Sequence, residues 1–253
     1  MKIVRFEAGG KVGYGVVEGD AVGMISGSPF GRLRRTGESH ALSSVRLLAP
    51  VPRPGKILAL AENYRSHLGD RPQPSRPEPF FKTATSVIGP GDAIVIPPGA
   101  QQVHEEGELV AVIGRRARNV SESEALDCVL GYTCGNDVSA RDWQRADRQW
   151  WRAKSADTFS PLGPWIVTPL DPTALTISVR LNGREVQRCR TNEMIYGVAY
   201  TIADLSKYVT LEPGDLLFTG TSGTTSQIRG GDVVEVEIEG IGTLRNPVTA
   251  AVS

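Results

Sequence analysis

Three carboxylates in the middle of the chain have the residue types and the spacing of a cation site. Glu106 and Glu108 stand two residues apart, and Asp137 follows about 30 residues later. Side chains two apart in an extended segment share a face, so Glu106 and Glu108 would lie together and Glu105 on the other face. Because like charges repel, such a pair requires solvation by water, a shared proton or a bound cation. The residues alone leave an exposed acidic edge open as an alternative.

A histidine and an aspartate form a second candidate pair. His67 and Asp70 stand three residues apart, so one helical turn would place them on the same face. A carboxylate beside an imidazole fixes its tautomer and stabilises its cation, which makes His67 a candidate general base. The alternative is a surface histidine beside a loop aspartate.

The segments around the carboxylates predict how the fold would position them. An unbroken apolar run over residues 109–113, ended by a glycine, is typical of a buried strand. A short helix that begins near Asn136 or Asp137 would place Arg141 and Gln144 on one face.

Two further helices and one long loop are predicted. Ser121 and Glu124 form a capping box for a helix over residues 121–130, and residues 191–208 also read as helical. Four prolines within residues 71–79 exclude a helix or a central strand there. This stretch is expected to be a loop of the length of a lid.

Strand-like segments outnumber helical ones. With 28 glycines and 17 prolines, the pattern predicts a β-rich α+β fold with many tight turns, among them Asn182-Gly183. A small β-rich N-terminal domain is expected over residues 1–50 and a second, larger domain over residues 51–253. The predicted strands lie at residues 2–6, 13–17, 21–25, 56–60, 109–113, 176–181, 216–219 and 233–238.

Composition excludes several classes of function. The 253 residues include 28 basic and 28 acidic side chains, a balance that gives no support for nucleic-acid or anionic-membrane partners. The first residues lack the apolar stretch of a signal peptide, and no apolar run approaches a membrane span. The three cysteines lack CxxC spacing, which indicates reduced thiols and a cytoplasmic location.

A series of motifs runs in a fixed order from about residue 56 to residue 248. The motifs are Asn63-Tyr64-x-x-His67, Phe80-Phe81-Lys82, Glu106-x-Glu108-Leu109, Asn136-Asp137-Val138-Ser139-Ala140-Arg141-Asp142-x-Gln144, Lys154-Ser155-x-Asp157-Thr158-Phe159-x-Pro161-Leu162-Gly163-Pro164-Trp165, Asn182-Gly183, Leu211-Glu212-Pro213-Gly214-Asp215 and Thr219-Gly220-Thr221. The series resembles that of the fumarylacetoacetate hydrolase family. The resemblance implies a catalytic domain of rolled, barrel-like mixed sheets, a homodimer, and a small 2-oxo acid as the substrate.

The resemblance also assigns roles to residues. Glu106, Glu108 and Asp137 would be the metal ligands, and their all-oxygen set suits Mg²⁺ or Mn²⁺, with Ca²⁺ as a further candidate. Family members pair a lid histidine with a glutamate to activate water, and here Asp70 stands at the glutamate position. Ser222 stands where the family commonly has proline. The expected catalytic residues are His67, Asp70 and Lys154, and the expected substrate-binding residues are Arg141, Gln144, Thr221 and Tyr64.

The preferred hypothesis is a divalent-metal-dependent hydrolase that cleaves a C–C bond in a 2,4-dioxo acid of the acylpyruvate type. The metal would stabilise an enolate, and His67 with Asp70 would deprotonate the attacking water. Decarboxylation or keto–enol isomerisation of a 2-oxo dicarboxylate, such as oxaloacetate or 2-hydroxyhepta-2,4-diene-1,7-dioate, would use the same enolate. A non-catalytic protein that binds metal or an oxo acid is the alternative from another class.

Overall fold

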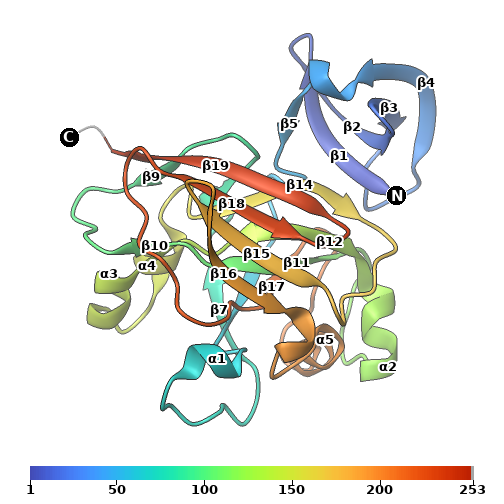
Figure 1. Cartoon of the computed structure of the whole chain (residues 1–253). Coiled ribbons are helices and arrows are strands. Elements are labelled where there is room, and N and C mark those ends of the chain that lie inside the picture. The colour runs from blue at the N-terminus through green and yellow to red at the C-terminus, as the bar shows by residue number, and fades with distance from the viewer. Residues whose placement is uncertain (252–253) are drawn as a thin grey trace.

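The N-terminal residues form a small antiparallel lobe. Its strands are β1 (Lys2–Ala8), β2 (Lys11–Glu18), β3 (Ala21–Ser26), β4 (Arg34–Ala41) and β5 (Arg46–Leu48). The computed structural model describes residues 1–251, and Figure 1 shows this lobe, in blue, at one corner of a larger body. The first three strands are confirmed. The sequence did not predict β4, because its residues are polar and almost all exposed.

A long mixed sheet runs through the larger body. Its strands there are β6 (Ile57–Ala61), β7 (Glu78–Lys82), β8 (Val87–Ile88), β11 (Gly107–Ile113), β12 (Val129–Asn136), β14 (Ser160–Val167) and β17 (Leu216–Phe218). The order is β4-β3-β2-β1-β14-β12-β11-β17-β6-β7, with β8 alongside β14 and β5 alongside β1. Because β1 pairs with β14, the lobe extends this sheet, and the division at residue 50 stays a prediction. Pro79 lies in the edge strand β7, where a residue without an N–H is tolerated.

A second sheet of five strands packs against β11 and β12. Its order is β16 (Arg184–Arg190), β15 (Thr176–Leu181), β18 (Val233–Ile238), β19 (Gly242–Ala250) and β9 (Ile94–Ile96). The predicted Asn182-Gly183 turn joins β15 to β16, and both turn residues have positive φ. Apolar side chains of the two sheets share one core, in which Leu109 and Val179 are fully buried. The β-rich fold is confirmed, and the order of the first sheet is open at both ends within residues 1–251.

The helices are short and lie outside the sheets (Figure 1). They are α1 (Arg65–Leu68), α2 (Glu122–Ala125), α3 (Arg141–Ala146), α4 (Trp151–Ser155) and α5 (Val198–Ser206). Single 3-10 turns occur at Leu42–Ser44, Ala84–Ser86, Leu126–Cys128 and Thr191–Glu193. A two-stranded ladder of β10 (Val103–His104) and β13 (Ser139–Ala140) lies between β12 and α3.

The helix predictions need correction in their lengths and starts. The capping box at Ser121 is present, but α2 ends at Ala125, because the chain passes through a 3-10 turn into β12. The helix predicted near Asn136 begins instead at Arg141, because β13 first pairs with β10. Within residues 191–208 the α-helix is only α5.

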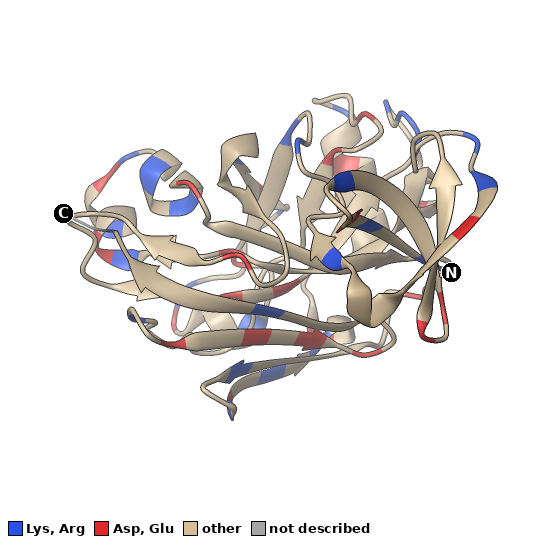
Figure 2. Cartoon of the chain, turned by 90° about the horizontal axis from the view of Figure 1, so that it is seen from above, with Lys and Arg blue, Asp and Glu red and all other residues tan. Residues whose placement is uncertain are grey.

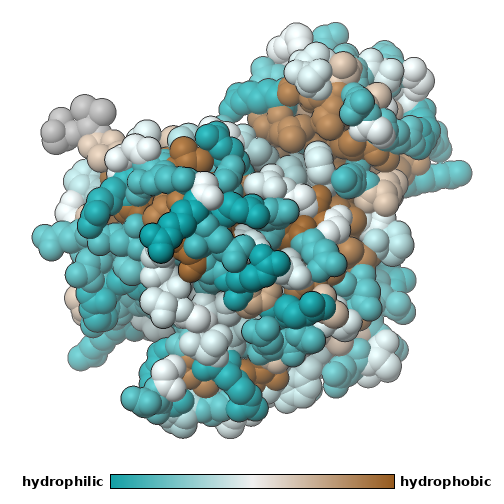
Figure 3. Space-filling view, in the orientation of Figure 1, coloured by the Kyte–Doolittle hydropathy of each residue, from teal (hydrophilic) through white to brown (hydrophobic). Residues whose placement is uncertain are grey.

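Positive and negative side chains are mixed over the molecule, as the equal numbers of basic and acidic residues suggest. Figure 2 shows Lys and Arg interleaved with Asp and Glu along the strands and loops. Figure 3 shows a largely hydrophilic face, with apolar residues gathered on the N-terminal lobe and where it meets the larger body. Within residues 1–251, no helix has both the length and the apolar character needed to cross a bilayer. All three cysteines are free and buried.

Candidate active site

Pairing of β11 with β12 brings the three carboxylates together. Gly107 lies opposite Asn136, so the residues that flank these positions meet at the same end of the two strands. Glu106, Glu108 and Asp137 each place one carboxylate oxygen within 4.8 Å of the others. Each is at most 3% exposed. The structure therefore forms one buried acidic cluster and excludes the exposed acidic edge.

Three cationic side chains from three different elements surround this cluster. Lys154 of α4 donates from Nζ to Glu106 Oε2 and to Asp137 Oδ2, both at 2.6 Å. Arg141 of α3 donates to Glu106 Oε1. Lys82 of β7 donates to Asp137 Oδ1 and, at 3.0 Å, to the carbonyl of Phe159. The site thus holds three acidic and three basic groups at close range.

The electrostatics of the cluster differ from one carboxylate to the next. Burial works to raise the pKa of Glu106, but Lys154 and Arg141 lower it below its ordinary value. Glu108 makes no ion pair within residues 1–251, and its Oε2 accepts the Gly220 N–H at 2.7 Å. Burial and the neighbouring carboxylates raise the pKa of Glu108 well above its ordinary value.

This donor set fits a hard divalent cation. The donors are carboxylate oxygens, which Mg²⁺ and Mn²⁺ prefer. Glu108 is a buried carboxylate without a cationic partner in the described chain, an arrangement that a bound cation would offset. Glu106, Glu108 and Asp137 are the residues that would hold it.

His67 faces the same cavity, but the predicted dyad is not formed. Gly69, with φ of 59°, ends α1 at Leu68. Asp70 is exposed and makes no hydrogen bond or ion pair with His67 in the described part of the chain. Nδ1 of His67 lies instead 2.6 Å from the carbonyl oxygen of Gly223. A catalytic role for Asp70 stays a prediction.

The Gly223 carbonyl defines the tautomer of His67. A carbonyl oxygen can only accept a hydrogen bond, so Nδ1 must carry the proton. In the neutral ring this leaves the lone pair on Nε2, and His67 has the form of a proton acceptor with no carboxylate partner among residues 1–251.

The other expected site residues divide into two groups. Arg141 donates to Gln144 Oε1 at 2.8 Å, so the two share a face of α3 as predicted, and both line the cavity. Thr221 also lines it, and its hydroxyl donates to the Gly107 carbonyl at 3.2 Å. Tyr64 is fully buried in the apolar core instead of on the cavity wall.

The cavity has a volume of about 80 Å³ and includes residues that the sequence did not single out. Phe80 and Trp150 form an edge-to-face aromatic pair with ring centroids 5.5 Å apart, and Lys154 lies over the Phe80 ring. Glu62 and Arg71 complete the charged part of the wall. The Phe80-Phe81-Lys82 motif gave a signal for Phe80 and for buried Lys82, whereas no pattern marked Glu62 or Arg71.

Known proteins resemble this chain over both its N-terminal lobe and its larger body. The family model for the fumarylacetoacetate hydrolase C-terminal domain matches residues 56–249, and the model for the Rv2993c-like N-terminal domain matches residues 1–50. Protein Rv2993c of Mycobacterium tuberculosis is 44% identical over 98% of each chain. The mitochondrial oxaloacetate tautomerase fahd2 of Xenopus laevis is 44% identical over 81% of this chain and 69% of that protein.

A solved structure extends the likeness to three dimensions. The crystal structure of 5-carboxymethyl-2-hydroxymuconate delta-isomerase from Mycobacterium smegmatis superimposes with a TM-score of 0.94 at 43% identity. The match covers 99% of this chain and 100% of that one. Members of this group are enzymes, and they include hydrolases, isomerases and tautomerases. The chain belongs to the fumarylacetoacetate hydrolase family.

Proposed function

We propose that the protein catalyses proton transfer at the carbon next to the 2-oxo group of a small 2-oxo acid, as a keto–enol tautomerase or isomerase. One observation carries the proposal. His67, with Nδ1 held by the Gly223 carbonyl, lines the same small cavity as Glu106, Arg141 and Lys154. The cavity thus combines a proton acceptor with cationic donors suited to an enolate.

The chain's own residues have separate tasks in this reaction. Arg141 and Gln144 would bind the carboxylate of the acid, because a guanidinium and an amide offer N–H donors from one face of α3. Nε2 of His67 would accept the proton from the carbon while the C–H electron pair forms the C=C bond of the enolate, and it would then deliver the proton to the enolate oxygen or, in an isomerase, to the far carbon of a dienolate. Lys154 would provide positive charge near the developing enolate oxygen. A divalent cation, when held by Glu106, Glu108 and Asp137, would polarise the 2-oxo carbonyl.

The names of the relatives support this choice. The Xenopus relative is named for tautomerisation of oxaloacetate, and the mycobacterial structure for an isomerase. Both reactions move one proton and one double bond, so a single acid–base group can carry them out. We assign this role to His67, which Asp70 does not contact in the described chain.

The test is a tautomerase assay with purified protein and MgCl₂ or MnCl₂. Enol-to-keto conversion of oxaloacetate is followed by the absorbance of the enol. We expect faster conversion with wild-type protein and loss of that acceleration in His67→Gln. His40→Gln is the matched control, because His40 lies in β4 of the N-terminal lobe. Acceleration that survives in His67→Gln would refute the assignment of the base.

Hydrolysis of a C–C bond in a 2,4-dioxo acid is the second candidate. The His67-x-x-Asp70 spacing favours it. Incubation with an acylpyruvate would then give pyruvate and a second carboxylic acid, which NMR resolves, and oxaloacetate decarboxylation would release CO₂. Turnover of none of these acids, with Mn²⁺ bound, would rule out an enzyme acting on these substrates and favour a non-catalytic protein that binds metal or an oxo acid.

A further inference from the structure

We infer that Arg71, held by Glu62, is a specificity-determining residue that binds the distal carboxylate of a 2-oxo dicarboxylate at the mouth of the cavity. The inference rests on the proposed function and narrows its substrate class. A substrate of this class carries one carboxylate beside the 2-oxo group and a second at the far end of a short chain.

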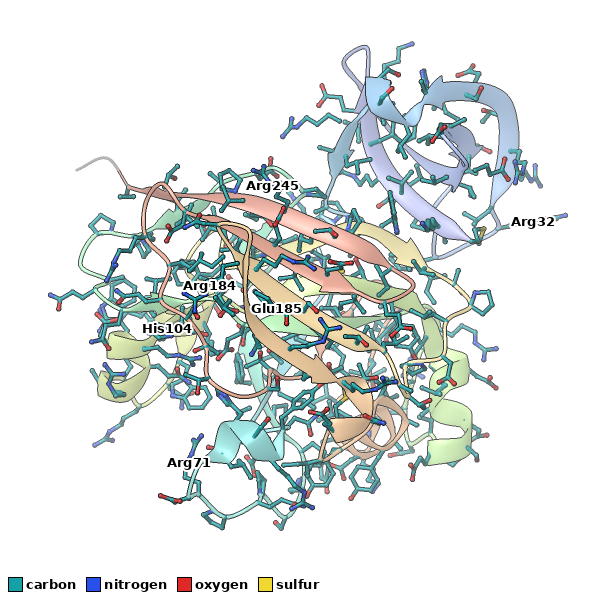
Figure 4. All side chains as sticks on the ribbon, viewed as in Figure 1. Arg32, Arg71, His104, Arg184, Glu185 and Arg245 are labelled. Atoms are coloured by element: carbon teal, nitrogen blue, oxygen red, sulfur yellow. The ribbon has the colours of Figure 1, made fainter. Side chains whose placement is uncertain are left out.

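Arg71 lies where the cavity opens to the outside. It follows α1 directly, and Figure 4 labels it beside this helix, on the same side of the molecule as His104. Arg71 lines the small inner cavity and also a wider outer groove that includes His104. Its side chain is 55% exposed. A ligand in the inner cavity would therefore meet Arg71 with the end that points outward.

Arg71 differs from Arg141 and Lys154 because it makes no contact with the acidic cluster in the described chain and keeps free donors at the mouth of the cavity. Arg141 and Lys154 both contact Glu106. Nε of Arg71 donates to the Leu68 carbonyl and Nη2 to the His67 carbonyl, both at 3.0 Å, and Nη1 donates to Glu62. A guanidinium has five N–H groups. These bonds use three of them, and the remaining two suit a carboxylate.

Glu62 fixes the guanidinium at this place. Glu62 has φ of 57°, a left-handed conformation that costs free energy for a residue with a side chain. It follows β6 and lines the cavity next to Arg71. Glu62 takes one N–H of the guanidinium, and a second carboxylate can bind at the donors left over. A neutral distal group could accept a hydrogen bond there but would lack the charge-assisted gain of a carboxylate.

The experiment compares oxaloacetate with its 4-methyl ester, which enolises in the same way but has a neutral distal group. In Arg71→Gln we expect kcat/KM for oxaloacetate to fall about 10- to 100-fold, mainly through KM, as the loss of a charge-assisted contact implies. For the ester the fall should be no more than about 3-fold. Arg76→Gln is the matched control, because Arg76 lies in the same loop but binds Asp204.

A purely structural role gives a different result. Arg71 also binds the carbonyls of His67 and Leu68, so loss of this support alone would lower kcat equally for both substrates. An equal loss, or no loss, overturns the inference and leaves the proposed function standing. A wild-type protein that converts neither substrate overturns both.

A second variant keeps the inference testable if Arg71→Gln does not fold. Glu62→Gln retains an oxygen acceptor for Arg71 but removes a negative charge from the wall. The ratio of kcat/KM for oxaloacetate to that for the ester should then rise by about 3-fold or more. An unchanged or lower ratio contradicts the inference.

Discussion

Lys82 and Lys154 donate to the two oxygens of one carboxylate. Nζ of Lys82 binds Oδ1 of Asp137, and Nζ of Lys154 binds Oδ2. Both lysines are buried, so their desolvation must be offset by ion pairs, which for Lys154 include Glu106 as well as Asp137, and for Lys82 by carbonyl contacts too. Lys82 also donates to the backbone carbonyls of Lys154 and Phe159. It therefore ties Asp137 to α4 and to the segment that enters β14.

Replacement of Lys82 by methionine should destabilise the fold. The substitution leaves Asp137 and two carbonyl groups without their buried donor, and breaking one side of a buried ion pair typically costs about 3–5 kcal/mol. The free energy of unfolding from urea titration measures the effect. Lys207→Met is the control, because Lys207 is exposed and pairs with Asp204 at 3.4 Å, which predicts a change of about 1 kcal/mol or less. Equal changes in the two variants would contradict the prediction.

Replacement of Glu108 by glutamine should separate cation binding from stability. The amide oxygen can still accept the Gly220 N–H, and burying a neutral amide costs less free energy than burying a carboxylate without a cationic partner. We expect the Tm of the cation-free protein to stay the same or rise. Affinity for Mn²⁺ should fall roughly 100-fold, because one charged ligand is lost. Isothermal titration calorimetry with Mn²⁺ measures this loss.

Thermal unfolding gives a second measure of the same cation. A ligand that binds only the folded state at 100 times its Kd adds about 2.7 kcal/mol, so Mn²⁺ should raise the Tm of the wild type and EDTA should reverse the rise. Glu105→Gln is the matched control. Glu105 is buried beside the cluster, but its Oε1 accepts the Ser226 N–H. If Mn²⁺ fails to raise the Tm of Glu105→Gln as well as that of Glu108→Gln, Glu108 is refuted as a specific ligand.

Local patterns predicted several strands, whereas the acidic cluster was predicted from the resemblance to a family. The strands predicted at residues 176–181 and 233–238 coincide with β15 and β18, because alternation and turn residues are properties of adjacent positions. The convergence of Glu106, Glu108 and Asp137 followed from family motifs and is produced by the pairing of β11 with β12. The pairing of these two strands is the physical cause of the cluster, whereas the motifs only indicated that the cluster would form.

Contacts between distant segments could not be predicted in this way. His67 is oriented by the carbonyl of Gly223, 156 residues away, and no local pattern encodes that contact. Spacing suggested Asp70 as the partner, but Gly69 ends the helix first. The pair of Glu62 and Arg71 depends on a left-handed residue that sequence alone does not reveal.

Gly107 should be intolerant of a side chain, since it stands between two ligands of the proposed site. A Cβ there would lie 2.3 Å from Val179 Cγ2, closer than two carbon atoms can pack, and a tight 3.3 Å from Val236 Cγ1. Gly107→Ala should lower the free energy of unfolding by about 1–3 kcal/mol and weaken Mn²⁺ binding. Gly23→Ala is the control, because its nearest neighbours would lie 3.8 Å away. Wild-type stability in Gly107→Ala would show that the sheets can separate here at little cost.

His67 and Asp70 should respond differently to substitution. His67→Gln removes the proton acceptor and should lower kcat of the tautomerase reaction by about 10²- to 10⁴-fold. Asp70→Asn should change it by less than about 3-fold, since Asp70 is exposed and makes no contact with His67 in the described chain. The same two variants are then assayed for acylpyruvate hydrolysis. If Asp70→Asn slows hydrolysis but spares tautomerisation, Asp70 takes part only where water is activated. If it abolishes both reactions, Asp70 and His67 act together and the single-base mechanism is wrong.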